Sequence, residues 1–122
     1  MKGARSVPEA HQTKLSAEDQ KLVTLARSAR ARLGAEEGAA VRDSEGRTYV
    51  AGTVTLPSFQ LTAIQAAVAA AISSGAEALE AAVVVSGDPL LKEASVNAVR
   101  DLGPAAPIYL VDPDGSVLQL VR

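Results

Sequence analysis

The chain has 122 residues and a formal net charge of −2, so bulk charge indicates neither a nucleic-acid partner nor an anionic membrane surface. Cysteine is absent, and the one histidine, His11, lies in a polar N-terminal tail. This composition removes most zinc-ligand, thiol and Ser-His chemistry from the rest of the chain. Because there is neither an apolar run of about 20 residues nor a signal-peptide pattern, we expect a cytoplasmic protein without a membrane partner.

Residues 1–14 are polar and basic and show no apolar period, so we predict a disordered N-terminal arm (1–14) and one folded domain (15–122). A first helix is predicted to begin after Ser16 as N-cap and to end at Gly34, since apolar residues recur between them at helical spacing. Its C-terminal half carries three arginines, which we interpret as a solvated face, with an anion-binding patch as the alternative: Arg27, Arg30 and Arg32.

Two apolar runs, 38–43 and 48–55, flank the polar turn 43–46 and predict a β-hairpin. Pro57 and Ser58 interrupt the second run, and a helix is predicted over 61–74. No charged residue occurs between Arg47 and Glu77. A helix that is apolar all round must be covered on every side, and its many alanines allow close approach of other elements.

The continuous apolar run 81–86 predicts a central strand that is buried on both faces. A third helix is expected over 89–102, stopped by Gly103-Pro104. Strands are expected at 108–111 and 116–121, joined by the turn residues between them. The order α-β-β-α-β-α-β-β predicts an α/β fold, a three-layer α/β/α sandwich around one mixed five-stranded sheet.

Several local phrases resemble the cytidine deaminases that act on free nucleosides. The first hairpin is similar through 38–41, 43–49 and Gly52, and the helix ends at 71–75 and 99–102 are similar as well. The resemblance extends over residues 16–122. It implies the cytidine deaminase-like fold, a zinc cofactor and a homo-oligomer, either a dimer or a tetramer.

The residues that carry chemistry in that family are missing. Members have Cys- or His-Ala-Glu at the start of one motif helix and Pro-Cys-x-x-Cys at the start of the other; three of these side chains hold zinc and the glutamate shuttles protons. Counting along the resemblance sets the first triplet on Thr62-Ala63-Ile64 and the two cysteines on Lys92 and Ser95. The ribose-contact phrase Asn-x-Glu stands as 54–56, Val-Thr-Leu. We therefore expect no zinc, no other cofactor and no catalytic residues.

Two carboxylate pairs, Glu36 with Glu37 and Glu77 with Glu80, are interpreted as solvated clusters, and Asp112 and Asp114 as turn formers. The leading hypothesis is an inactive deaminase-like protein that forms a homo-oligomer through its Ala-rich helix. One alternative is a nucleoside deaminase-related hydrolase. Another is a protein that binds a nucleoside, nucleotide or small anion at two helix N-termini, with the possible ligand site at Thr62, Ile64, Lys92 and Ser95.

Overall fold

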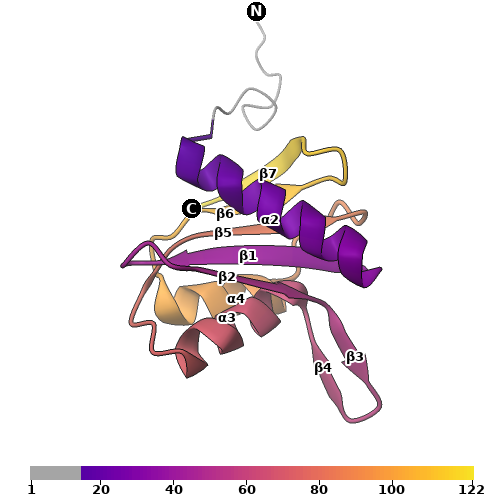
Figure 1. The fold of residues 1–122 in the computed structure, drawn as a ribbon, viewed down its shortest axis with the longest axis horizontal. Coiled ribbons are helices and arrows are strands. Elements are labelled where there is room, and N and C mark those ends of the chain that lie inside the picture. Colours follow the sequence, from indigo (N-terminus) through magenta and orange to yellow (C-terminus); the bar gives the residue numbers. More distant parts are fainter. Residues whose placement is uncertain (1–14) are drawn as a thin grey trace, which may run out of the picture.

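The computed structural model describes residues 15–122 of the chain, so the predicted N-terminal arm lies outside the described residues. A five-stranded sheet is covered by one helix on one face and by two on the other (Figure 1). In chain order the elements are α2 (Ala17–Leu33), β1 (Glu37–Asp43), β2 (Thr48–Gly52), β3 (Val54–Leu56), β4 (Phe59–Leu61), α3 (Ala63–Ser73), β5 (Leu79–Ser86), α4 (Glu93–Leu102), β6 (Ile108–Val111) and β7 (Val117–Val121).

The strand order is β2-β1-β5-β6-β7. Strand β1 pairs antiparallel with β2 and β5, β5 runs parallel to β6, and β7 returns antiparallel to β6. The sheet is therefore mixed, and the predicted three-layer sandwich and element order are confirmed. In the part of the chain that the structure describes, no helix is long and apolar enough to cross a membrane.

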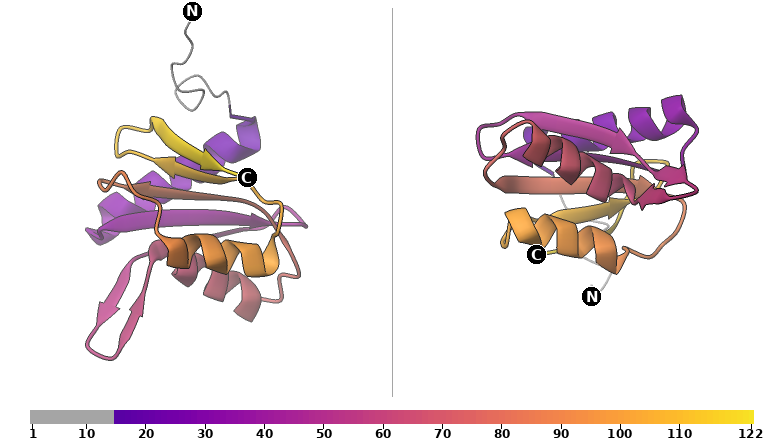
Figure 2. Two further views of the ribbon diagram at one scale, coloured as in Figure 1. Left: turned by 180° about the vertical axis from the view of Figure 1, so that it is seen from behind. Right: turned by 90° about the horizontal axis from the view of Figure 1, so that it is seen from below.

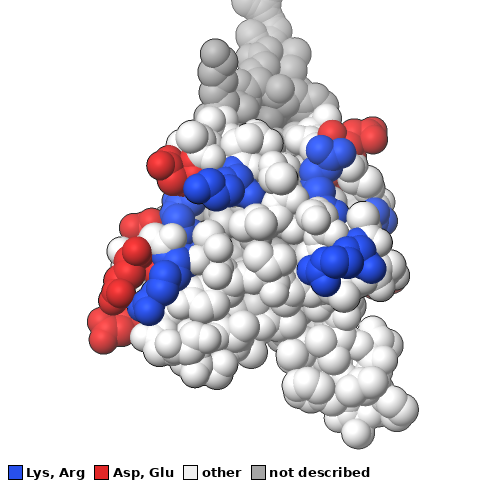
Figure 3. Space-filling view, in the orientation of Figure 1, with Lys and Arg blue, Asp and Glu red and all other residues white. Residues whose placement is uncertain are grey.

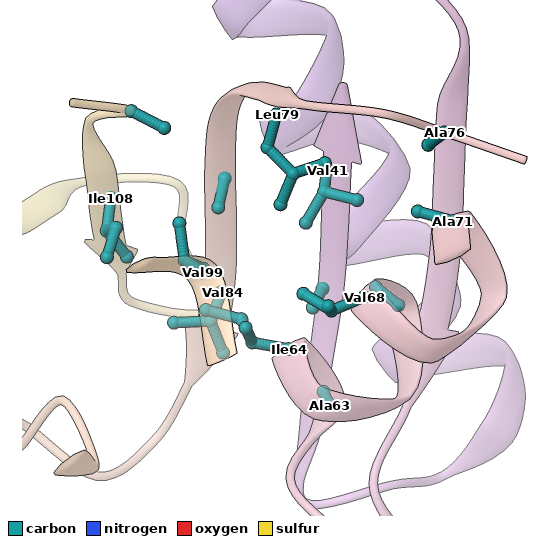
Figure 4. Packing of buried hydrophobic residues seen from close by; sticks show 14 of the residues in the cluster. Val41, Ala63, Ile64, Val68, Ala71, Ala76, Leu79, Val84, Val99 and Ile108 are labelled. Atoms are coloured by element: carbon teal, nitrogen blue, oxygen red, sulfur yellow. The ribbon is translucent and has the colours of Figure 1, made fainter. Parts of the chain in front are cut away.

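Two apolar cores lie on the two faces of the sheet. The core under α3 and α4 is built from short side chains, among them Val41, Ile64, Val84, Val99 and Ile108 (Figure 4). The core under α2 takes the alternate residues of the same strands, because successive side chains of a strand point to opposite faces. It includes Leu22, Val23, Ala40, Val83 and Val85.

A second, two-stranded sheet was not predicted. The expected strand 48–55 ends at Gly52 because Thr53 turns out of the sheet, with its hydroxyl accepting a hydrogen bond from the Glu37 N–H at 2.8 Å. The chain then forms a separate hairpin, β3–β4, and residues 57–58 make its turn rather than simply breaking a strand. The predicted helix 61–74 consequently begins later, at Ala63.

The third helix also begins later than expected, at Glu93 rather than at residue 89. The Ser86 hydroxyl accepts from the Asp88 N–H and an Asp88 carboxylate oxygen accepts from the Leu90 N–H, both at 3.0 Å. Such local bonds from side chain to backbone compete with helical hydrogen bonds. The segment before α4 is held as a turn for this reason.

Helix α3 is not covered on every side by the described part of its own chain, so the expected cover on its remaining face stays a prediction. One face is buried against the sheet and α4, whereas Ala69, Ile72 and Ser73 are exposed within the single chain. Ile72 alone leaves 52% of its surface exposed. Within residues 15–122, this apolar face of α3 is therefore not covered by any other part of the same chain.

Candidate functional site

The site lies where the N-termini of α3 and α4 come together beside β1 (Figure 2). The Ser95 hydroxyl, in the first turn of α4, donates a hydrogen bond of 2.8 Å to the Thr62 hydroxyl, which caps α3. These residues are 33 positions apart in the sequence. The structure therefore brings together two of the side chains that the resemblance singled out.

Thr62 is fixed by a capping box. Its hydroxyl accepts from the Gln65 N–H at 3.1 Å, while the Gln65 side-chain oxygen accepts from the Thr62 N–H at 2.9 Å. Together with the bond from Ser95, the Thr62 oxygen accepts two hydrogen bonds, so both of its lone pairs are engaged. The spacing Thr-x-x-Gln is a known helix-start pattern that our sequence analysis missed.

Glu37 is buried, and the prediction that it forms a solvated pair with Glu36 is wrong. Only 3% of Glu37 is exposed. One carboxylate oxygen accepts from the Ala63 N–H at 3.1 Å, at the positive end of α3, and the other lies 3.4 Å from the Lys92 ammonium. The Lys92 ammonium also lies 3.8 Å from an oxygen of the exposed Glu36. The one cation is therefore shared between two carboxylates.

The four predicted site residues do not share one environment. An open cleft of about 310 Å³ is lined by Thr62 and Lys92. The rest of its lining is mostly polar and comes from Glu36, Thr53, Val54, Thr55, Gln60, Leu61 and Gln65. Ser95 is buried, with 1% exposed, and Ile64 is buried completely in the core under α3 and α4 (Figure 4).

The zinc ion that the resemblance implies does not fit these residues. Zinc in proteins takes thiolate, imidazole or carboxylate ligands. Here Thr62 and Ser95 offer neutral hydroxyls that bond to each other, and Lys92 offers a cation. Across residues 15–122 no group of three His, Cys, Asp or Glu side chains is placed to hold a metal ion.

Two of the three arginines at the C-terminal half of α2 donate hydrogen bonds to loop carbonyls. Arg27 donates to the Pro113 carbonyl and Arg30 to the Glu36 carbonyl, each at 3.1 Å. Asp112 organises its turn as predicted, since its carboxylate accepts from the N–H groups of Asp114 and Ser116. An anion-binding patch on α2 is therefore not supported by the contacts of these two arginines.

A second polar network lies on the α2 side of the sheet and was not predicted. Arg42 of β1 forms ion pairs of 3.0 Å with Asp19 of α2 and with Glu80 of β5. The Tyr109 hydroxyl donates to the other Asp19 oxygen at 2.9 Å. Burial and this hydrogen bond raise the pKa of Tyr109 to about 12. The network joins α2, β1, β5 and β6 and opens onto no cleft described above.

Comparisons with known proteins agree with this architecture. A family model described as cytidine deaminase-like matches residues 15–115. A search of curated protein sequences finds no match. The solved structure of cytidine deaminase from Burkholderia pseudomallei is similar with a TM-score of 0.75 and 21% identity, over 88% of this chain and 93% of that chain.

Two mycobacterial enzymes give the same result. Cytidine deaminase from Mycobacterium leprae is similar with a TM-score of 0.66 and 22% identity, over 86% of this chain and 94% of that chain. Cytidine deaminase from Mycobacterium tuberculosis has a TM-score of 0.65 and 23% identity, over 82% and 89% respectively. At these identities the likeness shows a shared fold.

Proposed function

The chain belongs to the cytidine deaminase-like family, and from that premise we propose that it is a non-catalytic member that acts by associating with copies of itself. The absence of catalysis is inferred from the contacts at the N-termini of α3 and α4, the two helices that the resemblance identifies as motif helices. The Thr62 and Ser95 hydroxyls bond to each other at 2.8 Å, and the Lys92 ammonium is paired with Glu37. At the positions that the resemblance assigns to the metal ligands, these side chains are thus engaged in a hydrogen bond and an ion pair with one another and with Glu37.

The chemical consequence follows from the pKa of water. Zinc lowers the pKa of a bound water from 15.7 to about 7, which supplies hydroxide at neutral pH. Ile64, at the position that the resemblance assigns to the proton-shuttling glutamate, lies in the apolar core and exchanges no proton. The site provides no ligand set for the metal that would form hydroxide, and its two carboxylates, Glu36 and Glu37, are paired with Lys92, so deamination by the family's route is not expected.

Association is supported by the distribution of charge. In Figure 3 the charged side chains lie on the upper part of the molecule and down its left edge, whereas the β3–β4 hairpin and the bottom of the body, where α3 lies, are white. Helix α3 leaves Ala69 and Ile72 exposed on this uncharged region. Apolar surface of this kind, rimmed by polar residues, is typical of a protein interface.

Catalysis is tested by metal analysis of the purified protein together with an ultraviolet assay for the conversion of cytidine to uridine. We expect no stoichiometric zinc and no turnover above the rate without protein. Zinc at one ion per chain together with measurable turnover would contradict the non-catalytic assignment. Loading the protein with excess zinc before the assay controls for metal lost in purification.

Association is tested by light scattering on the native protein at micromolar concentration. We expect the mass of a dimer or a tetramer. The mass of a single chain across that concentration range would contradict self-association but would not affect the proposal that the protein is non-catalytic. The cytoplasmic location expected from the sequence remains a prediction of the same proposal.

A second candidate function, ligand binding, is favoured by the open cleft at Thr62 and Lys92. Because the one ammonium of Lys92 is shared by two carboxylates, Glu36 and Glu37, we expect a neutral nucleoside to bind there in preference to phosphate or a nucleotide. A ligand that binds the native state raises the unfolding temperature. Thermal unfolding with cytidine, uridine, their monophosphates and inorganic phosphate tests this candidate, and equal curves for all of them would remove it.

A further inference from the structure

The β3–β4 hairpin stands apart from the rest of the molecule. It forms its own two-stranded sheet, and it projects from the body in Figure 1 and in the left view of Figure 2. Among the helices its main contact is with α3, through β4. An isolated two-stranded hairpin is marginally stable in water, so a projecting one needs further burial to hold its shape.

The hairpin has one apolar face and one polar face. Its cross-strand pairs are Val54–Leu61, Thr55–Gln60 and Leu56–Phe59. Paired residues share a face and successive pairs alternate, so the first and third pairs form the apolar face. Thr55 and Gln60 form the polar face, and they line the cleft together with Val54 and Leu61 at the root of the hairpin.

The apolar face is only half covered by its own chain. Val54 and Leu61, at the root, are partly buried, whereas Leu56 and Phe59, at the tip, are each 54% exposed. Alternation of apolar and polar residues is typical of a strand with one buried face. The tip residues follow this pattern, yet in the described part of the chain nothing buries them.

We propose that the hairpin is an exchange arm, whose apolar tip packs on the outer face of α3 in a second copy of the chain. The inference rests on the self-association in the proposed function and names the surfaces that make it. In a two-fold contact each copy would give its Leu56 and Phe59 to the partner and receive the partner's arm on its own α3.

We infer that the partner is a second copy of the chain, because one contact between two copies would bury both the hairpin tip and the outer face of α3. The arm and the outer face of α3 lie within the same run between Arg47 and Glu77, which holds no charge. No ion would have to be desolvated when they meet, and charged residues are depleted in the cores of protein interfaces. The receiving face has small residues beside Ile72, so that a large Phe59 ring can lie close to the helix.

The first experiment compares dissociation constants by analytical ultracentrifugation. We expect Phe59→Ser and Leu56→Ser each to weaken self-association at least roughly tenfold, as truncation of a buried interface anchor does. Leu90→Ser is the matched control, since Leu90 is 69% exposed on a different loop, and it should leave the dissociation constant unchanged. Circular dichroism checks that each variant keeps its fold.

The second experiment uses the absence of native cysteine. One preparation carries Ser58→Cys at the hairpin turn, the other Ala69→Cys on the outer face of α3, and the two are mixed under mild oxidation. A mixed disulfide can then only join different chains, and we expect it to form. Replacing the second preparation with Ser28→Cys, on the exposed face of α2, should abolish it.

The outcomes separate the two proposals. A native protein that is a single chain in solution overturns self-association and the arm with it. A native oligomer whose dissociation constant is unchanged by Phe59→Ser, or that gives no cross-link between positions 58 and 69, overturns the exchange arm and leaves self-association intact. Weakening by Phe59→Ser together with the cross-link supports the arm.

Discussion

Gly38 marks the closest approach between α2 and the sheet. A Cβ at this position would collide with the backbone carbonyl of Ala26 and lie 2.7 Å from the Arg30 backbone nitrogen. Both neighbours are helix backbone, which cannot move aside as a side-chain end can. We expect Gly38→Ala to lower the free energy of unfolding by about 3 kcal/mol, at the upper end of the cost of overpacking. Urea unfolding measures the change.

Gly87→Ala serves as the control for that measurement. A Cβ at Gly87 would have only the Arg30 guanidinium within reach, at 3.7 Å, which is ordinary contact. We expect a change within about 0.5 kcal/mol, as for most surface substitutions. Equal effects of the two substitutions would show that α2 does not lie as close to β1 as described.

Tyr109 makes the folded protein sensitive to alkaline pH. Burial and the bond to Asp19 raise its pKa to about 12, whereas in the unfolded chain it titrates near 10. The folded state therefore keeps the phenolic proton after the unfolded state has lost it. The stability that this proton contributes is present below about pH 10 and is lost as the pH rises toward 12.

The titration of Tyr109 can be observed directly, since the chain has two tyrosines and no tryptophan. In a Tyr49→Phe variant, the ultraviolet absorbance of phenolate reports Tyr109 alone. We expect the folded variant to titrate about two pH units above free tyrosine, and Tyr109→Phe to flatten the fall in unfolding temperature between pH 10 and 12. A midpoint near 10 while the protein remains folded would mean that the Asp19 bond does not persist in solution.

At the scale of elements, the start of α3 is held by the same hydroxyl that joins it to α4. Thr62→Val keeps the shape of the side chain but removes the helix cap and the acceptor for Ser95. Loss of a cap costs about 1 kcal/mol and a buried donor left without a partner about as much again, so we expect roughly 2 kcal/mol in urea unfolding.

A double-mutant cycle with Ser95→Ala isolates the bond between the two helices. If Thr62 and Ser95 act on each other, the combined variant should lose less than the sum of the single losses, with a coupling of about 1 kcal/mol. Thr24→Val, where an exposed hydroxyl bonds within its own helix, is the control and should change little. Strict additivity would place the two hydroxyls out of contact.

Elements with strong boundaries were predictable from the sequence. Strand β6 was placed at its observed bounds because Pro107 precedes it and an Asp-Pro-Asp-Gly turn follows it. The hairpin β3–β4 was missed because its strands have three residues each and a proline lies in its turn, so the local pattern indicates an interruption. Whether such a short segment pairs with itself or joins the main sheet depends on Thr53 and Glu37, which are distant in sequence.

The candidate site was predictable only in part, because some of its contacts join residues that are distant in sequence. Glu36 and Glu37 are adjacent and chemically identical, yet the side chain of the first is 77% exposed and that of the second 4%. Glu37 is the first residue of β1 and its carboxylate meets the start of α3, whereas Glu36 lies in the loop before the strand. The pairing of Lys92 with Glu37 therefore required the tertiary arrangement, whereas Thr62 and Ser95 were found through the resemblance.

At the scale of the whole molecule, the charged residues are unevenly distributed over the elements of residues 15–122. Helix α2 carries arginines and carboxylates that pair with the sheet and the loops, while α3 and the β3–β4 hairpin carry no charge. Charge on a surface favours contact with water and absence of charge favours contact with protein. In a homo-oligomer built as proposed, α2 and the charged residues of α4 would remain exposed to solvent, and α3 and the hairpin would face the partner.

The last prediction is that the fold can still hold zinc once its ligands are supplied. Lys92 and Ser95 have the Cys-x-x-Cys spacing and Thr62 lies in contact with Ser95, so Thr62→Cys, Lys92→Cys and Ser95→Cys combined place three thiols at two helix N-termini, which favour thiolates. We expect this variant to bind one zinc ion, with an unfolding temperature that rises with zinc, since a ligand at a hundred times its dissociation constant stabilises by about 2.7 kcal/mol. The native chain and a Thr62→Ser, Lys92→Ser control should show no such dependence in scanning calorimetry. No zinc in the cysteine variant would mean that the helix N-termini are not spaced as described, whereas an equal zinc response in the native chain would contradict the proposal that this protein works without the metal.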